Sequence, residues 1–248
     1  MPYREKKIYS GKMLEVEIYP ISKEERKQKR KKKERESIPK QQNLNDKNAM
    51  KHLIRLYNAN FTDKDLAVHL TYTDKELPKS EEEARRDVVN FIRRIKHYRK
   101  KHGMEDLKYL AVIEYKEPQD NQKGVRMHHH VVMSGMDRDI VEGLWKKGRA
   151  NADRLQADEY GYEALGRYVS KGPKGSKKWT QSKNLKQPTV KVNDYKFSRR
   201  KIYEIAKTPE DNEMFSKFYE GYFLNECKVS VNKETDAIYL YVKMRKLE

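Results

Sequence analysis

Residues 107–135 have the sequence LKYLAVIEYKEPQDNQKGVRMHHHVVMSG, in which two apolar stretches flank a polar connection. Residues 107–116 and 125–135 are rich in the β-branched and aromatic residues that strands favour. The connection, residues 117–124, contains Pro, Asn, Asp and Gly, which are typical of turns. The pattern therefore predicts two antiparallel strands that fold back on one another near Asn121.

The segments on either side of this strand pair are predicted to be further strands and helices. DLAVHLTYT (65–73) alternates as a half-buried strand does. Ser80 and Glu83 form a capping box that opens a helix over 80–102, and Gly103 stands where that helix should end. Further on we expect a helix over 137–148, an edge strand over 148–156 and a helix over 158–172. The order predicts an α+β, ferredoxin-like fold, with an antiparallel sheet, helices on one face and the other face free.

Three segments are expected along the chain. Residues 1–62 would be a basic N-terminal extension, with a strand or hairpin arm at 7–19, a charged helix or flexible arm at 22–36 and an amphipathic helix at 44–59. Residues 63–194 would form the central domain. Residues 195–248 would add a helix and a C-terminal β-hairpin around the turn KETD.

The composition indicates a polyanionic partner. The chain has 248 residues and a formal net charge of +18, more than solubility requires, so nucleic acid and anionic membrane are the candidates. A single cysteine, Cys227, excludes a disulfide within the chain. Because no signal peptide and no run of about 18 apolar residues is present, we expect a soluble, cytoplasmic protein with no membrane partner.

The three consecutive histidines predict a metal site. On a strand, His128 and His130 point to one face and His129 to the other, where it would pack or support its neighbours. Folding 107–116 back on 125–135 places Glu114 opposite His128, and paired residues share a face. Two imidazoles and a carboxylate suit a catalytic divalent ion, Mn²⁺ or Mg²⁺ with Zn²⁺ as an alternative. The competing interpretation is a surface histidine cluster.

A candidate nucleophile lies on the last helix of this order. Tyr168 is followed three residues later by Lys171, so both lie on one helix face. A tyrosine hydroxyl is a weak nucleophile until its charge is stabilised, which a lysine or a metal-bound phosphate can do. The competing interpretation is a tyrosine of the core, since the chain has 17 tyrosines.

Together these residues resemble the HUH endonuclease superfamily, in particular its rolling-circle replication initiator (Rep) proteins. HLTYTD (69–74) is similar to the first family motif, MHHHVVM (127–133) to the HUH motif and YVSK (168–171) to the tyrosine motif. The resemblance implies metal-dependent nicking of single-stranded or hairpin origin DNA, a 5′-phosphotyrosine link to Tyr168, and metal ligation by Glu114, His128 and His130. It also implies a host helicase as partner. His129 departs from the hydrophobic residue usual at the centre of the motif.

Basic and aromatic residues near these motifs are candidates for holding the DNA. They are Arg126, Arg154, Arg167, Lys174, Lys177, Lys178, Trp179 and Lys183. Three alternatives stay open at this point: a relaxase or single-tyrosine transposase with the same chemistry, a non-catalytic RRM-like nucleic-acid-binding module, and a zinc-stabilised interaction protein that recruits His69 as a fourth ligand.

Overall fold

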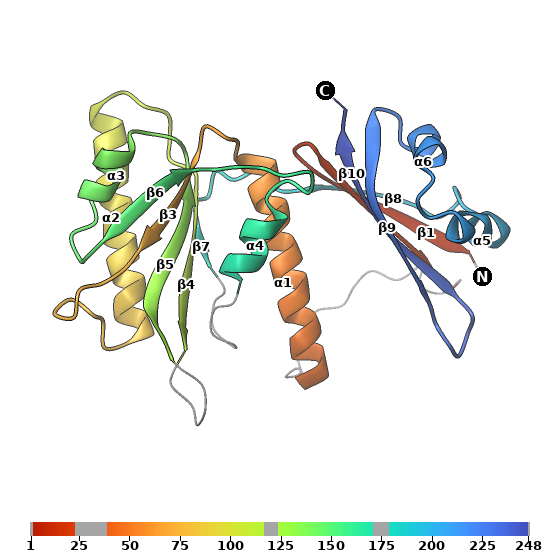
Figure 1. The fold of residues 1–248 in the computed structure, drawn as a ribbon, viewed down its shortest axis with the longest axis horizontal. Coiled ribbons are helices and arrows are strands. Elements are labelled where there is room, and N and C mark those ends of the chain that lie inside the picture. The colour runs from red at the N-terminus through yellow and green to blue at the C-terminus, as the bar shows by residue number, and fades with distance from the viewer. Residues whose placement is uncertain (1, 23–38, 117–123, 171–178, 248) are drawn as a thin grey trace. The chain divides into compact units, whose positions relative to one another are not determined.

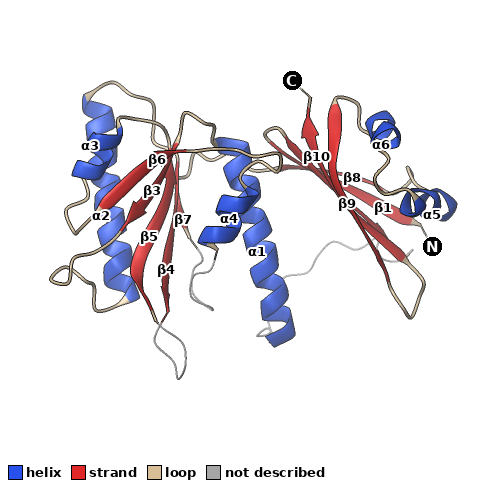
Figure 2. Cartoon of the chain, viewed as in Figure 1, coloured by secondary structure: helices blue, strands red, loops and turns tan. Residues whose placement is uncertain are grey.

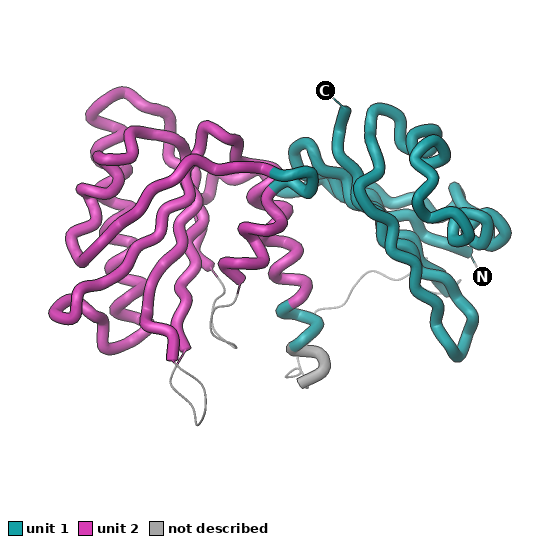
Figure 3. Tube along the Cα trace, viewed as in Figure 1, with its two compact units in different colours: residues 1–46, 158–161, 187–248 teal, residues 47–157, 162–186 magenta. Residues whose placement is uncertain are grey.

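The computed structural model describes residues 2–22, 39–116, 124–170 and 179–247. Over these residues the chain is α+β, with two antiparallel five-stranded sheets and six helices (Figures 1 and 2). The residues group into two compact units, coloured separately in Figure 3. Unit 1 comprises residues 1–46, 158–161 and 187–248, and unit 2 comprises residues 47–157 and 162–186. The division into three segments at 1–62, 63–194 and 195–248, expected from the sequence, stays a prediction.

Unit 2 contains the strands expected from the sequence. Its sheet has the order β6-β3-β5-β4-β7, and every neighbouring pair is antiparallel. The first four strands of that order have the ferredoxin-like arrangement, and β7 adds a short fifth strand at the edge. The strands are β3 (Leu66–Leu70), β4 (Tyr109–Lys116), β5 (Val125–Met133), β6 (Ala150–Arg154) and β7 (Thr180–Gln181).

Helices cover both faces of this sheet, so the expectation of helices on one face only is wrong. One core joins the sheet to α2 (Glu81–Lys101) and α3 (Arg138–Gly143), and includes Val68, Phe91 and Val131. A second core joins the other face to α1 (Pro39–Asn60) and α4 (Glu163–Val169), and includes Tyr57 and Val132. The physical reason is that β4 and β5 carry continuous apolar runs, which are typical of strands buried on both faces.

The ends of α2 are those that the sequence predicted. Ser80 is the N-cap, and its Oγ accepts a hydrogen bond from the backbone N–H of Glu83 at 3.2 Å. The Glu83 carboxylate accepts one from the backbone N–H of Lys79 at 2.9 Å. At the other end Gly103 has a φ of 62°, the left-handed conformation that commonly terminates a helix.

Unit 1 is built around the second sheet, with the order β8-β1-β2-β10-β9. The expected basic helical extension at the N-terminus is not shown: residues 3–20 form the central hairpin of this sheet, and residues 23–38 lie outside the described part. The expected C-terminal hairpin is confirmed as β9 and β10. The elements are β1 (Tyr3–Ser10), β2 (Met13–Pro20), β8 (Thr189–Asn193), α5 (Arg199–Lys207), α6 (Asn212–Phe218), β9 (Tyr222–Val231) and β10 (Ile238–Lys246).

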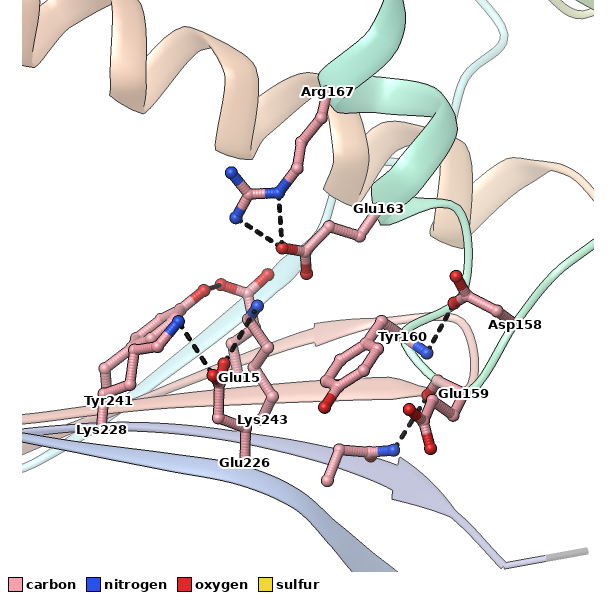
Figure 4. A network of polar contacts seen from close by, with 11 residues as sticks. Glu15, Asp158, Glu159, Tyr160, Glu163, Arg167, Glu226, Lys228, Tyr241 and Lys243 are labelled. Atoms are coloured by element: carbon pink, nitrogen blue, oxygen red, sulfur yellow. Dashed lines mark hydrogen bonds and ion pairs between the residues drawn. The ribbon is translucent and has the colours of Figure 1, made fainter.

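The two faces of the unit 1 sheet differ in chemistry. One face packs its apolar residues against α5 and α6. The other carries polar groups, drawn in Figure 4. There the buried Lys243 lies 3.4 Å from a Glu226 carboxylate oxygen, and the Tyr241 hydroxyl donates to Glu15 at 2.5 Å. Pairing of this kind compensates for the desolvation of a buried charge.

No helix among the described residues has both the length and the apolar character that crossing a bilayer requires.

Candidate functional site

Three neighbouring strands of unit 2 bring the metal-site residues to one face of the sheet. In the register of β4 and β5, Glu114 lies opposite His128, as the sequence predicted, and Val112 lies opposite His130. In the register of β3 and β5, His69 lies opposite His130. Because paired residues share a face, all four polar side chains converge on the face that also carries α1 and α4.

The ligating atoms of this group lie within a few ångströms of one another. The Nε2 atoms of His128 and His130 are 3.1 Å apart. One carboxylate oxygen of Glu114 lies 3.3 Å from His130 Nε2 and 3.5 Å from His128 Nε2. These residues are the ones for which the sequence predicted metal ligation, and the structure brings them together.

His69 joins this group and forms a histidine cluster with His128 and His130. One ligand nitrogen of each lies within 4.8 Å of the others. The His69 ring stacks on His130, with a centroid distance of 5.0 Å and an interplanar angle of 9°. The alternation of residues 65–73 had already placed His69 on the face opposite Leu66. The pairing of β3 with β5, which brings His69 beside His130, has no local signal in the sequence.

The environments of His69 and His130 favour neutral imidazoles with free lone pairs. Burial, with smaller contributions from His128 and His69, lowers the pKa of His130 to about 3. Burial, and then His128, also lowers the pKa of His69. His128 Nδ1 lies 2.8 Å from the Arg126 carbonyl oxygen, which can only accept, so in the neutral ring Nε2 carries the lone pair that faces the cluster.

These groups fit a divalent ion. Among the described residues, His69 Nε2 is a buried nitrogen that has no hydrogen-bond partner. Convergent neutral imidazoles beside a carboxylate are the donor set that divalent transition metals accept. A bound ion would provide the partner that the His69 nitrogen lacks.

Tyr168 is held over the histidine cluster by α4. Its ring centroid lies 5.2 Å from that of His130, at 76°, and the residue is 53% exposed. The position of α4 follows from a close approach to α1, because a Cβ on Gly166 would lie 2.4 Å from Ile54 Cγ1. Lys171, the expected partner of Tyr168, lies outside the described residues.

His129 points to the opposite face of the sheet. It is 1% exposed, its Nε2 lies 2.8 Å from the Tyr72 hydroxyl, and its ring packs edge-on against Trp145. Burial first, and then the charges of His128, His130 and Arg85, lower its pKa to about 3. His129 is therefore a buried packing residue behind the metal-site strand.

Those DNA-binding candidates that the structure describes are dispersed over unit 2. Arg126 is held by Asp74 at 2.6 Å and by the Tyr72 carbonyl oxygen at 3.0 Å. Arg154 pairs in register with Leu66, at the end of β3 away from His69, and donates to the carbonyl oxygen of Lys64.

The other candidates lie on or after α4. Arg167, next to Tyr168 in the chain, pairs with Glu163 at 2.6 Å (Figure 4). The Trp179 ring centroid lies 6.1 Å from that of His52, and Lys183 lines a groove beside α2. Lys174, Lys177 and Lys178 lie outside the described residues.

The comparison with family models gives one match to the segment that contains the site. Residues 65–173 match the family described as Replication-associated protein ORF2/G2P. The comparisons with curated proteins and with solved structures found no match. The matched segment runs from the start of β3 past Tyr168, and so includes Glu114 and all members of the histidine cluster. The matched segment is thus similar to the replication-associated protein ORF2/G2P family, a rolling-circle Rep-type family related to the HUH endonucleases.

Proposed function

We propose that the protein nicks single-stranded origin DNA through Tyr168 and remains joined to the 5′ end by a phosphotyrosine bond. The observation that carries this proposal is the position of the Tyr168 ring, 5.2 Å from His130 and half exposed, above a convergent set of metal-ligating atoms. A core tyrosine would be buried and would not overlie such a set. The similarity of this segment to a replication-associated family supports origin DNA as the substrate.

In the proposed reaction the Tyr168 oxygen attacks the scissile phosphorus. The bond from phosphorus to the 3′ oxygen breaks, a bond from phosphorus to the tyrosine oxygen forms, and the proton lost by the phenol is balanced by one taken up on the 3′ oxygen. His69, Glu114, His128 and His130 would hold a divalent ion, which when bound polarises the phosphate. Lys171 would supply a positive charge near the attacked phosphate. Phosphoryl transfer to tyrosine conserves the bond for later rejoining.

The protein's own residues fix the geometry of this step. The packing of Gly166 against Ile54 sets the position of α4, and the strand register sets the positions of the histidines. Since the pKa of His130 lies near 3, its ring stays neutral at physiological pH and can ligate rather than donate a proton. A host helicase that unwinds the nicked DNA remains a prediction from the resemblance.

The test uses single-stranded oligonucleotides that tile the DNA carrying this gene, labelled at the 3′ end, with Mn²⁺ or with EDTA. We expect a labelled protein–DNA adduct that survives denaturing electrophoresis, requires the metal and is absent in Tyr168→Phe. Tyr160→Phe is the matched control, since it removes a hydroxyl eight residues earlier in the chain. Cleavage without an adduct would show that water is the nucleophile. Metal-independent binding without cleavage would favour the RRM-like binding module.

A further inference from the structure

The solvent-facing side of α2 carries a row of cations. Its exposed residues after the first turn recur at the three- and four-residue spacing of one helix face. None is acidic, and five are lysine or arginine. They are Arg86, Val89, Asn90, Arg93, Lys96, His97, Lys100 and Lys101. From Arg86 to Lys101 this cationic face extends about 22 Å, at 1.5 Å per residue.

The charges of the cationic face are not compensated locally. Within the described part of the chain, no ion pair involves Arg86, Arg93, Lys96, Lys100 or Lys101. On the flank of the same helix, Arg85 lies 2.5 Å from the Glu81 carboxylate. Uncompensated like charges on one helix repel each other, so their accumulation opposes folding unless an anion neutralises them.

A groove continues the cationic face toward the sheet edge. It has a volume of about 830 Å³, and its walls include Lys96 and Lys100 of α2 and the segment that follows β7, with Lys183. Tyr109 also lines it, and the Lys96 ammonium lies 5.7 Å from the centroid of the Tyr109 ring. Glu105 and Asp106 are the carboxylates among its described lining residues, and Lys96, Lys100 and Lys183 outnumber them.

This surface is separate from the candidate nicking site. The helix packs on the face of the sheet that carries Val68 and Val131, and Figure 1 shows it lying along that sheet. His69 and His130 alternate with these residues, so they point to the opposite face. A DNA strand bound at Tyr168 therefore does not account for the cations of α2.

We propose that the cationic face of α2, with the adjoining groove, binds the phosphate backbone of duplex DNA. Duplex DNA carries one negative charge per about 1.7 Å of axis, so a straight row of long basic side chains finds phosphates along its whole length. Sites for single strands add several aromatic side chains on which bases stack, whereas the cationic face exposes no Phe, Tyr or Trp and the adjoining groove is lined by one, Tyr109. Backbone contacts position DNA without reading its sequence. The surface would hold duplex on the side of the sheet opposite the single-stranded site.

The experiment measures duplex binding by the full chain as a function of salt. The probe is a fluorescein-labelled duplex of about 20 base pairs and mixed sequence, in EDTA, with NaCl from about 50 to 200 mM. The variant carries Arg93→Gln, Lys96→Gln and Lys100→Gln. We expect its plot of log K against log salt to be less steep by about 2.7, because each lost phosphate contact removes about 0.9. We also expect at least a tenfold loss of affinity at the lowest salt.

The matched control removes three exposed lysines of unit 1, by Lys207→Gln, Lys217→Gln and Lys233→Gln. It has the same net charge, and it should keep the wild-type slope. Equal loss in both variants, or an unchanged slope in the α2 variant, would overturn the proposal. An equal loss of affinity for a single strand of the same length would also overturn it. Because EDTA removes the metal and no nicking is measured, the result does not depend on the chemistry of Tyr168.

Folding of the α2 variant is checked by its thermal midpoint, since glutamine is a good helix former. If the triple variant unfolds, Lys100→Gln alone should flatten the slope by about 0.9. In that case Lys100→Arg, which keeps the charge, should restore the wild-type slope. Equal salt slopes for Lys100→Gln and Lys100→Arg would contradict the proposal.

Discussion

At the scale of single residues, His69 decides how the metal is held. Its Nε2 is buried without a hydrogen-bond partner and lies within reach of His128 and His130. If it ligates, His69→Ala should weaken Mn²⁺ binding by at least about 10-fold, the smallest loss that even supporting contacts around metal sites cause. Titration calorimetry would measure this, with His52→Ala as the control outside the histidine cluster. Unchanged affinity in His69→Ala would limit the ligands to Glu114, His128 and His130.

The buried His129 should make the stability of the apoprotein fall in acid. Its folded pKa, about 3, lies below the ordinary value of 6.5, so the unfolded chain binds a proton that the folded protein excludes. Its stabilising contribution is complete above pH 6.5 and is lost as the pH falls toward 3. Each pH unit in this window costs about 1.4 kcal/mol, or about 2 kcal/mol between pH 6.5 and 5.

Urea unfolding in EDTA at pH 6.5 and pH 5 would measure this loss, in the wild type and in His129→Leu. The leucine variant should lose about 2 kcal/mol less over the same interval, because it has no proton to gain there. It should also be less stable at pH 7, since the buried Tyr72 hydroxyl loses its partner. The same pH dependence in both proteins would assign the effect to other groups.

At the scale of elements, the contact between α4 and α1 positions Tyr168. A methyl group at Gly166 would meet Ile54 Cγ1 at 2.4 Å, and Ile54 is buried. Gly166→Ala should therefore displace α4 and cost about 1–3 kcal/mol of stability, as overpacking does. Adduct formation should fall more than stability explains, because Tyr168 moves with α4. The measurements are thermal unfolding and the denaturing-gel assay.

A second substitution tests whether Gly166→Ala acts through its contact with Ile54. Ile54→Ala removes the clashing Cγ1, so Gly166→Ala combined with Ile54→Ala should recover part of the adduct yield of the single glycine variant. In a double-mutant cycle the two changes should be coupled rather than additive. Additive losses would show that Gly166 matters for some reason other than its contact with Ile54.

The sequence predicted those elements whose signals are local. The Ser80–Glu83 capping box, the alternation around His69 and the Glu114–His128 pairing depend on residues close in the chain or joined by one turn. The hairpin β1–β2 entering a sheet with β8 and β10 depends on pairings across nearly the whole chain, such as Val16 with Val242, which no local pattern specifies. The sequence did not predict that α1 and α4 pack on the second face of the unit 2 sheet, because an apolar run indicates that a strand is buried without indicating which element buries it.

At the scale of the whole molecule, removal of the N-terminal hairpin should unfold unit 1 without unfolding unit 2. β1 and β2 lie between β8 and β10, and contribute Tyr3, Leu14, Val16 and Ile18 to the core of unit 1. Losing four such side chains removes about 6–12 kcal/mol of burial energy, comparable with the stability of a domain. The two cores of unit 2 contain no residue from this segment.

Deletion of residues 2–22 should therefore unfold unit 1 and leave unit 2 folded. Hydrogen exchange followed by mass spectrometry should show β9 and β10 exchanging as an unfolded chain does, while β3, β4 and β5 remain protected. Because the histidine cluster lies in unit 2, Mn²⁺ binding should persist. Val16→Asp in the full chain, which places a charge at a buried position of β2, should give the same pattern without a deletion. Loss of protection in both sheets would show that unit 2 needs unit 1 to fold, and the N-terminal hairpin would then support the nicking site as well as its own sheet.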